Sequence, residues 1–134
     1  MKKKPTLSSL RKKAWKLVSE YVRRREADEG GFVHCYTCSH AIHWKYEAQA
    51  GHAIGGRRNA VLFDDSIIRP QCYACNAKHI GNGRPHIFMT KLVIENGWDW
   101  WAAKVEEAKK IVKYTTSDLE ELIQAYKAKL EAMP

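Results

Sequence analysis

Two Cys-x-x-Cys pairs constrain this chain more than any other feature of its sequence. Cys35 is paired with Cys38 and Cys72 with Cys75, and these are the only four cysteines in 134 residues. Structural zinc is held in a tetrahedron of ligands, and a Cys-x-x-Cys turn presents two thiolates to one ion. We therefore predict one zinc site of four cysteines that joins two distant turns. Four thiolates leave no open coordination position, so this zinc should be structural and any chemistry should lie elsewhere.

The compartment expected from the sequence favours a metal over disulfides. No apolar run has membrane-spanning length, and no leader of charged, apolar and small residues is visible. We therefore expect a soluble cytoplasmic protein without a membrane partner, in which paired thiols bind metal. The alternatives are four free or catalytic thiols, or a histidine that replaces one cysteine. Three histidines crowd the first pair, namely His34, His40 and His43.

Positive charge is concentrated at the start of the chain. The net charge is +8, and the first 25 residues hold ten Lys or Arg against one acid, Glu20. This asymmetry predicts a polyanionic partner such as DNA, because each neutralised phosphate releases counterions. The alternative is a solvated tail that aids solubility. The predicted DNA-binding residues are Arg11, Lys12, Lys13, Lys16, Arg23 and Arg24, with Arg57 and Arg58 at a Gly-Gly turn.

The apolar pattern predicts an α+β fold with a single domain over residues 1–134. Residues 1–28 form a basic arm and an amphipathic helix, with Ser8 or Ser9 as the N-cap of a helix over residues 8–27. Residues 32–84 form a zinc-bound core, and residues 85–134 form C-terminal helices. The flanking helices are therefore expected to support the small core.

The core is expected to contain short strands and one short helix. Residues 46–53 and 61–63 have strand character, with Gly55 and Gly56 as the turn between them. A short helix should begin near Cys72. Further helices are expected over residues 86–95, after a cap at Asp99, and after a capping box of Ser117 and Glu120. Trp98, Trp100 and Trp101 are expected to pack in these helices rather than to stack on bases.

Two residues, one between the cysteine pairs and one directly after the second pair, suggest hydrolytic chemistry. Phosphodiester hydrolysis needs a base that deprotonates water and a divalent cation that takes charge from the phosphate. His52 follows Gly51 between the two pairs, and Asn76 directly follows Cys75. A histidine on a strand that faces an asparagine on a neighbouring helix can supply the base and a metal ligand. The alternatives are that His52 is only structural, and that Asn76 only caps the short helix at the second cysteine pair or bonds a cysteine sulfur.

This arrangement resembles the zinc-bearing HNH nucleases and, more narrowly, the NinG/Rap family of lambdoid-phage recombination endonucleases. The resemblance covers roughly residues 10 to 97. Its matching pieces are residues 14–25, Cys35 and Cys38, residues 49–52, Phe63, residues 71–76, Gly81-Asn82 and residues 92–97. It implies a small ββα-metal (HNH, His-Me finger) core flanked by N-terminal and C-terminal helices. It also implies an HNH-type DNA endonuclease of the host-cell cytoplasm that cuts D-loops or Holliday junctions in phage recombination.

The resemblance also assigns roles to residues and leaves one metal ligand open. It implies that His52 is the general base and that Asn76 binds a catalytic Mg²⁺ or Mn²⁺. Many HNH enzymes carry an acidic ligand just before the base, where this chain has Gly51, and an asparagine near position 67, where it has Ile67. The remaining ligand is open among Gln49, Asp64, Asp65 and His79. Asp65 and His79 are chemically the better ones, and His79 could instead contact phosphate or solvent.

Two other functions and one oligomeric state are considered beside the nuclease. The missing acidic ligand favours a non-catalytic zinc-containing module that binds nucleic acid, and a zinc-ribbon adaptor for proteins is the third alternative. Junction DNA has two-fold character, so a homodimer would suit it, with the C-terminal amphipathic helices as interface. The same apolar stripes could instead cover the core of one chain.

Overall fold

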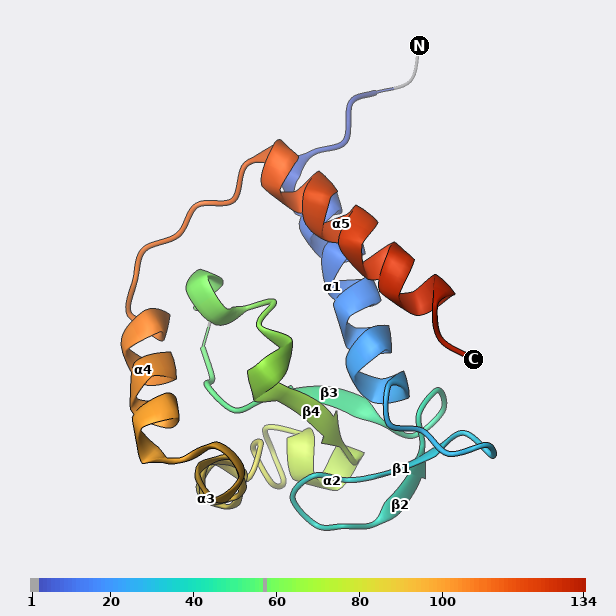
Figure 1. Ribbon diagram of the computed structural model, residues 1–134, viewed down its shortest axis with the longest axis vertical. Coiled ribbons are helices and arrows are strands. Elements are labelled where there is room, and N and C mark those ends of the chain that lie inside the picture. The colour runs from blue at the N-terminus through green and yellow to red at the C-terminus, as the bar shows by residue number, and fades with distance from the viewer. Residues whose placement is uncertain (1–2, 57) are drawn as a thin grey trace.

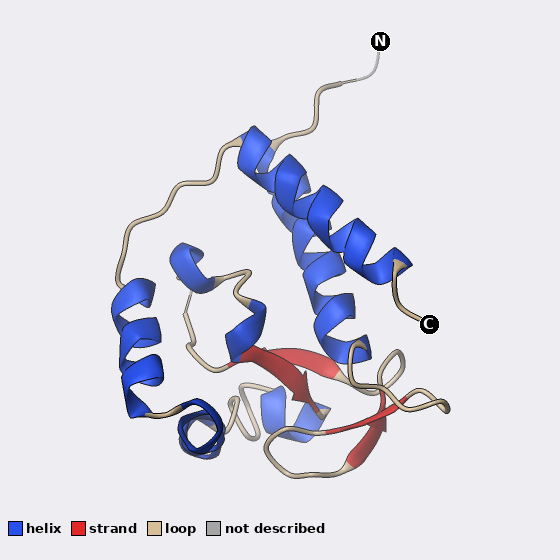
Figure 2. Ribbon diagram, viewed as in Figure 1, coloured by secondary structure: helices blue, strands red, loops and turns tan. Residues whose placement is uncertain are grey.

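The computed structural model describes residues 3–56 and 58–134, which form five α-helices and two small antiparallel sheets (Figures 1 and 2). No helix in this described part is long and apolar enough to span a membrane. The elements are α1 (Leu7–Arg24), β1 (Phe32–His34), β2 (Ala41–His43), β3 (Gln49–His52), β4 (Ile68–Gln71), α2 (Tyr73–Asn76), α3 (Pro85–Asn96), α4 (Trp98–Ala108) and α5 (Thr116–Glu131). The predicted α+β class is confirmed.

The first helix, α1, forms where the apolar periodicity places it. Its stripe of Leu10, Ala14, Val18 and Val22 is buried. The helix begins one residue earlier than expected because Thr6, rather than Ser8 or Ser9, is the N-cap. The Thr6 hydroxyl accepts from the Ser9 amide at 3.1 Å, and the Ser9 hydroxyl accepts from the Thr6 amide at 3.0 Å. This reciprocal pair satisfies two amides that a helix start leaves unpaired.

The last helix, α5, packs along α1, and the two lie side by side in Figure 1. Its apolar stripe of Leu119, Ile123, Tyr126 and Leu130 is buried, and the first three of these residues share a core cluster with α1. The capping box is Thr115 with Asp118, two residues before the predicted Ser117 and Glu120. The stripe considered for a dimer interface is therefore used inside the chain on α5.

The two sheets are hairpins of very short strands. In the first, Phe32 pairs with His43 and Val33 with Ile42. In the second, β3 and β4 pair from Gln49 with Gln71 to His52 with Ile68. Of the strand predicted over residues 46–53, only Gln49–His52 forms a strand.

The strand predicted over residues 61–63 is wrong, because a 3-10 turn covers Asn59–Val61. Val61 and Phe63 are both buried, but in two different apolar clusters. A short apolar run has the same composition in a strand and in a buried turn, so the pattern could not distinguish them.

The helices α3 and α4 meet at Gly97, whose positive φ of 93° ends one helix and begins the next. Asp99 lies in the first turn of α4 and does not cap it. Trp101 is buried with Phe88 and Leu92, which confirms its core role, whereas Trp98 is 60% exposed. This pair of helices supports the loop between β3 and β4 from the side away from α1 (Figure 1).

An ion pair fastens the β3–β4 loop to α4. Asp64 accepts from the Ser66 amide at 3.0 Å and from Lys104 Nζ at 2.6 Å. Both charged side chains are at most 20% exposed. Burial alone would raise the pKa of Asp64, but the hydrogen bonds from Lys104 and Ser66 outweigh it and lower the pKa. The carboxylate is therefore held ionised beside the turn that carries Leu62.

We predict that Lys104→Met lowers the free energy of unfolding by about 1–2 kcal/mol, because it leaves a half-buried carboxylate without its cation. Urea unfolding of the zinc-loaded protein measures this. Lys109→Met is the matched control, since Lys109 pairs with Glu106 on the same helix but is 62% exposed. The control should change stability by less than about 0.5 kcal/mol. Equal effects of the two variants would contradict the role given to Asp64.

Candidate functional site

The four cysteines converge on one point between the two hairpins. Their sulfur atoms all lie within 4.8 Å of one another, although 33 residues lie between the two pairs. Zinc–sulfur bonds of about 2.3 Å imply sulfur–sulfur edges of about 3.8 Å in a tetrahedron. Cys38 Sγ and Cys72 Sγ are 3.7 Å apart. The donor set and its spacing therefore fit a zinc ion.

The surroundings of Cys35 favour a thiolate. Burial alone would raise the pKa of Cys35, but the backbone amide of Cys72 and the hydroxyl and amide of Thr37 outweigh it and lower the pKa to about 6. Desolvation and the neighbouring sulfurs instead raise the pKa of Cys38 and Cys72. A dication that replaces these protons relieves the crowding of the four sulfurs.

We predict that zinc affinity rises with pH, because the thiols must lose their protons to bind the ion. The slope of affinity against pH should steepen below about pH 6, where Cys35 also becomes protonated in the metal-free protein. Competition with a chromophoric chelator across this range measures it. Cys38→Ser should lose zinc and lower the melting temperature, whereas His40→Ala should keep both. Zinc loss in the His40 variant would mean that this histidine replaces a cysteine ligand.

His52 stands at the end of β3 with its ring held on two sides. Its Nε2 lies 3.0 Å from the carbonyl oxygen of Leu62. The ring stacks on Trp15 of α1 at 4.8 Å between centroids and 21° between planes. A carbonyl can only accept, so this contact places the proton on Nε2 and leaves the lone pair on Nδ1. Among the described residues none hydrogen-bonds Nδ1, so the ring can accept a proton there.

Asn76 lies beside Gln49 rather than beside His52. Its amide Nδ2 donates to Gln49 Oε1 at 2.8 Å. Gln49 and His52 are three residues apart on one strand, so their side chains leave opposite faces of the β3–β4 pair. Within residues 3–56 and 58–134, no hydrogen bond joins His52 to Asn76. The two residues share one hairpin and its following helix, but their side chains bond to different partners.

The acidic residues considered as ligands are held by cations instead. Asp65 accepts from the Tyr126 hydroxyl at 2.6 Å and lies within 4 Å of Arg25 and Lys129. Burial first, and then this bond to Asp65, raises the pKa of Tyr126. Asp64 likewise forms an ion pair with Lys104. These side chains tie the loop to α1, α4 and α5.

The other histidine considered, His79, is exposed and contacts the Tyr73 hydroxyl at 3.3 Å. In the described part of the chain, the four-cysteine cluster is the only group of three or more His, Cys, Asp or Glu side chains close enough to share an ion. The residues around His52 therefore do not fit a divalent ion held by carboxylates.

A buried glutamine fills the space in front of Gly51. A Cβ on Gly51 would lie 1.8 Å from Gln71 Oε1 and 2.6 Å from its Cδ. Gln71 is fully buried, and its Nε2 donates to Thr37 Oγ1 at 3.0 Å and to the Gly83 carbonyl at 2.9 Å. The Thr37 hydroxyl in turn lies 3.6 Å from Cys35 Sγ. Gly51 is thus matched to Gln71, and an acidic side chain in its place would displace that amide.

The predicted DNA-binding residues divide into two groups. Lys12, Lys13, Lys16 and Arg58 are exposed. The guanidinium of Arg11 donates to Asn59 Oδ1 at 2.8 Å, and that of Arg23 donates to the Trp44 carbonyl at 2.9 Å. Arg24 pairs with Glu20 at 3.3 Å. Arg57 lies outside the described residues. Fold contacts therefore occupy part of the charge of Arg11, Arg23 and Arg24.

A family model described as "Bacteriophage Lambda NinG protein" matches residues 1–134. The chain belongs to the NinG family. This confirms the resemblance and extends it from residues 10–97 to the C-terminal helices. No curated protein and no solved structure matches the chain.

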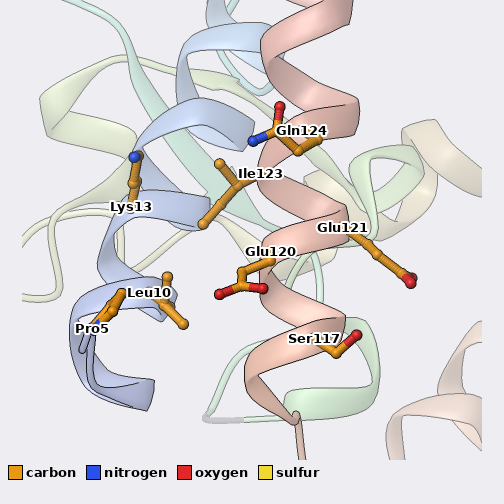
Figure 3. Close-up of a pocket in the computed structure, with 8 residues that line it drawn as sticks. All are labelled: Pro5, Leu10, Lys13, Ser117, Glu120, Glu121, Ile123 and Gln124. Carbon is orange, nitrogen blue, oxygen red and sulfur yellow. The ribbon is translucent and has the colours of Figure 1, made fainter.

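One hollow of the molecule lies apart from these groups. It has a volume of about 630 Å³ and lies between the starts of α1 and α5 (Figure 3). Leu10 and Ile123 contribute its apolar wall, and Lys13 and Glu120 its charged rim. It contains neither His52 nor a cysteine, so we assign it no part in the chemistry of this NinG protein.

Sequence reasoning missed two residues that hold the site, Trp15 and Gln71. Trp15 is part of an amphipathic helix, and nothing in its spacing distinguishes a histidine partner from the core. Gln71 carried only a weak signal, because it is a polar residue placed directly before the second cysteine pair. A polar side chain that is buried there must find partners inside the fold.

We predict that Gly51→Ala lowers the free energy of unfolding by about 1–3 kcal/mol through overpacking against Gln71. Removing the obstructing amide as well, in Gly51→Ala/Gln71→Ala, should cost less than the sum of the single changes. Urea unfolding of the four zinc-loaded proteins gives this cycle. Gly55→Ala is the control, since a Cβ there meets nothing within 4 Å. Strictly additive effects would show that the two positions are independent.

Proposed function

We propose that this NinG-family protein is a DNA endonuclease that hydrolyses phosphodiester bonds in branched recombination intermediates, with His52 as the general base. The single observation that carries the proposal is the His52 ring, whose tautomer is set by the Leu62 carbonyl at 3.0 Å. Family membership supports the same conclusion. The order β3, β4 and α2 around His52 agrees with an HNH core, which forms part of the proposal.

In this proposal His52 acts through Nδ1. Nδ1 takes a proton from water while the water oxygen attacks phosphorus and the phosphorus–oxygen bond to the leaving strand breaks. The leaving oxygen takes a proton from solvent water and becomes a hydroxyl group. The Leu62 carbonyl stabilises the imidazolium that forms, and Trp15 keeps the ring in one plane. General base catalysis of this kind contributes about 10²- to 10⁴-fold to the rate. Since the described residues place no cluster of carboxylates near His52 that could hold a divalent ion, no step is assigned to Mg²⁺ or Mn²⁺, although the cleavage assay includes each of them.

The proposed DNA track follows α1. Lys12, Lys16 and Arg23 share one side of the helix at spacings of four and seven residues. A shallow hollow lined by Leu7, Arg11, Lys12 and Leu62 adjoins the carbonyl that holds His52. Backbone phosphates placed there would position the strand without reading its sequence. This is the contact expected of an enzyme that selects a branch by shape.

A non-catalytic zinc module that binds nucleic acid is the second candidate. The observation that favours it is that Gln71 packs against Gly51 and leaves no room for an acidic ligand there. In addition, Asp64 is paired with Lys104, and Asp65 with Arg25 and Lys129. This module would keep the zinc site and the basic helix but would not hydrolyse DNA. The two candidates therefore differ only in cleavage.

We predict that His52→Ala lowers the rate of cleavage of a labelled branched DNA, with Mg²⁺ or Mn²⁺ present, by at least about 100-fold. DNA affinity and zinc content should stay unchanged, because His52 is not a zinc ligand. His34→Ala is the matched control, since His34 is an exposed histidine on β1, which belongs to the other sheet. The non-catalytic candidate stands instead if the wild-type protein binds but never cuts DNA with either ion.

A further inference from the structure

The β1–β2 hairpin carries a cluster of aromatic side chains that the proposed cleavage does not use. Phe32 and His43 are a cross-strand pair with ring centroids 5.5 Å apart. The turn after β2 adds Tyr46, whose ring stacks on His43 at 4.8 Å and 28°. Trp44 lies beside them, 6.3 Å from His43. We call Phe32, His43, Trp44 and Tyr46 the hairpin platform.

The platform is partly open to solvent. Tyr46 is 77% exposed and Phe32 is 45% exposed. Cross-strand packing explains the contact of Phe32 with His43, because strands of three residues need side-chain pairs to persist. It does not explain Tyr46, which lies outside the strand register. A group of touching aromatic rings, two of which are this exposed, is the kind of patch that marks a binding surface.

Three cations lie against rings of the platform, and the carboxylates of Asp28 and Glu47 accept hydrogen bonds from the backbone amides of Phe32 and His43 beside it. The guanidinium carbons of Arg23 and Arg24 lie 5.6 and 5.5 Å from the Trp44 ring centre. Lys45 Nζ lies 5.6 Å from the centre of the Tyr46 ring. Aromatic faces that alternate with Arg and Lys are the combination that binds single strands, since bases stack on the rings and phosphates meet the cations. A duplex hides its base faces and cannot use the rings in this way.

The platform also lies at one end of the proposed DNA track. Trp15, which stacks on His52, and Arg23, which contacts Trp44, are eight residues apart on α1. A helix rises 1.5 Å per residue, so about 12 Å of helix separates the two levels. Figure 1 shows the β1–β2 hairpin near the C-terminal end of α1. A strand that leaves the His52 region along α1 would reach the platform within a few nucleotides.

We propose that the hairpin platform binds unpaired bases of a DNA strand next to a branch point, by stacking on Tyr46 and Phe32. This inference rests on the proposed function for its substrate, but it concerns binding and not hydrolysis. It gives the protein a means to prefer branched over uniform duplex DNA, because only a branch offers unstacked bases beside a duplex.

The test uses the zinc-loaded full chain and a labelled oligothymidylate of about 15 nucleotides, with a duplex of equal length for comparison. Fluorescence anisotropy gives the affinity for each. Tyr46→Ala should weaken binding of the single strand by about tenfold and change duplex binding by less than about twofold, as expected for one lost stacking contact. Tyr46→Phe should bind like wild type, because stacking needs only the ring.

Trp98→Ala is the matched control, since Trp98 is a 60% exposed aromatic residue on α4. Figure 1 shows α4 on the far side of the molecule from the hairpin. Unchanged zinc content and melting temperature confirm that each variant is folded. The proposal is overturned if Tyr46→Ala binds the single strand like wild type, if the Trp98 variant loses as much affinity, or if single strand and duplex weaken equally.

The two proposals fail separately. A wild-type protein that cuts no DNA, but whose Tyr46→Ala variant selectively loses the single strand, would end the nuclease proposal and keep the platform. If the wild-type protein cuts branched DNA, and Tyr46→Ala cuts and binds it with the same rate and affinity, the nuclease proposal is kept and the platform proposal is ended.

Discussion

The convergence of Cys35, Cys38, Cys72 and Cys75 is the constraint on which the functional half of the structure depends. It ties the β1–β2 hairpin to the junction of β4 and α2. Strands of three or four residues and a helix of four do not persist alone in water. A metal ion across these turns can supply the missing stability directly, as structural zinc does in other small domains.

Gln71 extends that constraint from the cysteines to the strand that bears His52. Its amide donates to Thr37, whose hydroxyl contacts Cys35, while its oxygen fills the space before Gly51. The strand therefore fits only with glycine at position 51. The same packing that anchors β3 removes the place where an acidic metal ligand would stand. In this chain the Gln71 side chain and an acidic side chain at position 51 would need the same space, so the two cannot be present together.

The first helix serves the core and the surface at once. One side of α1 is buried against α5, another carries Trp15 under the His52 ring, and a third carries Lys12, Lys16 and Arg23. Because these sides belong to one element, His52, the basic stripe and the hairpin platform keep fixed relative positions. The proposed recognition of a branch by shape would use that fixed spacing.

The sequence by itself determined the features that depend on local spacing. The two Cys-x-x-Cys turns, the amphipathic stripes of α1 and α5, a strand at His52 and a short helix after Cys72 all follow from short-range patterns and ligand chemistry. Only the tertiary structure decided what those side chains meet. Asp65 is held by Arg25, Lys129 and Tyr126, Gln71 occupies the place before Gly51, and Asn76 meets Gln49 instead of His52. Such partners come from distant segments of the chain, and packing among them depends on shape and volume that no local pattern encodes.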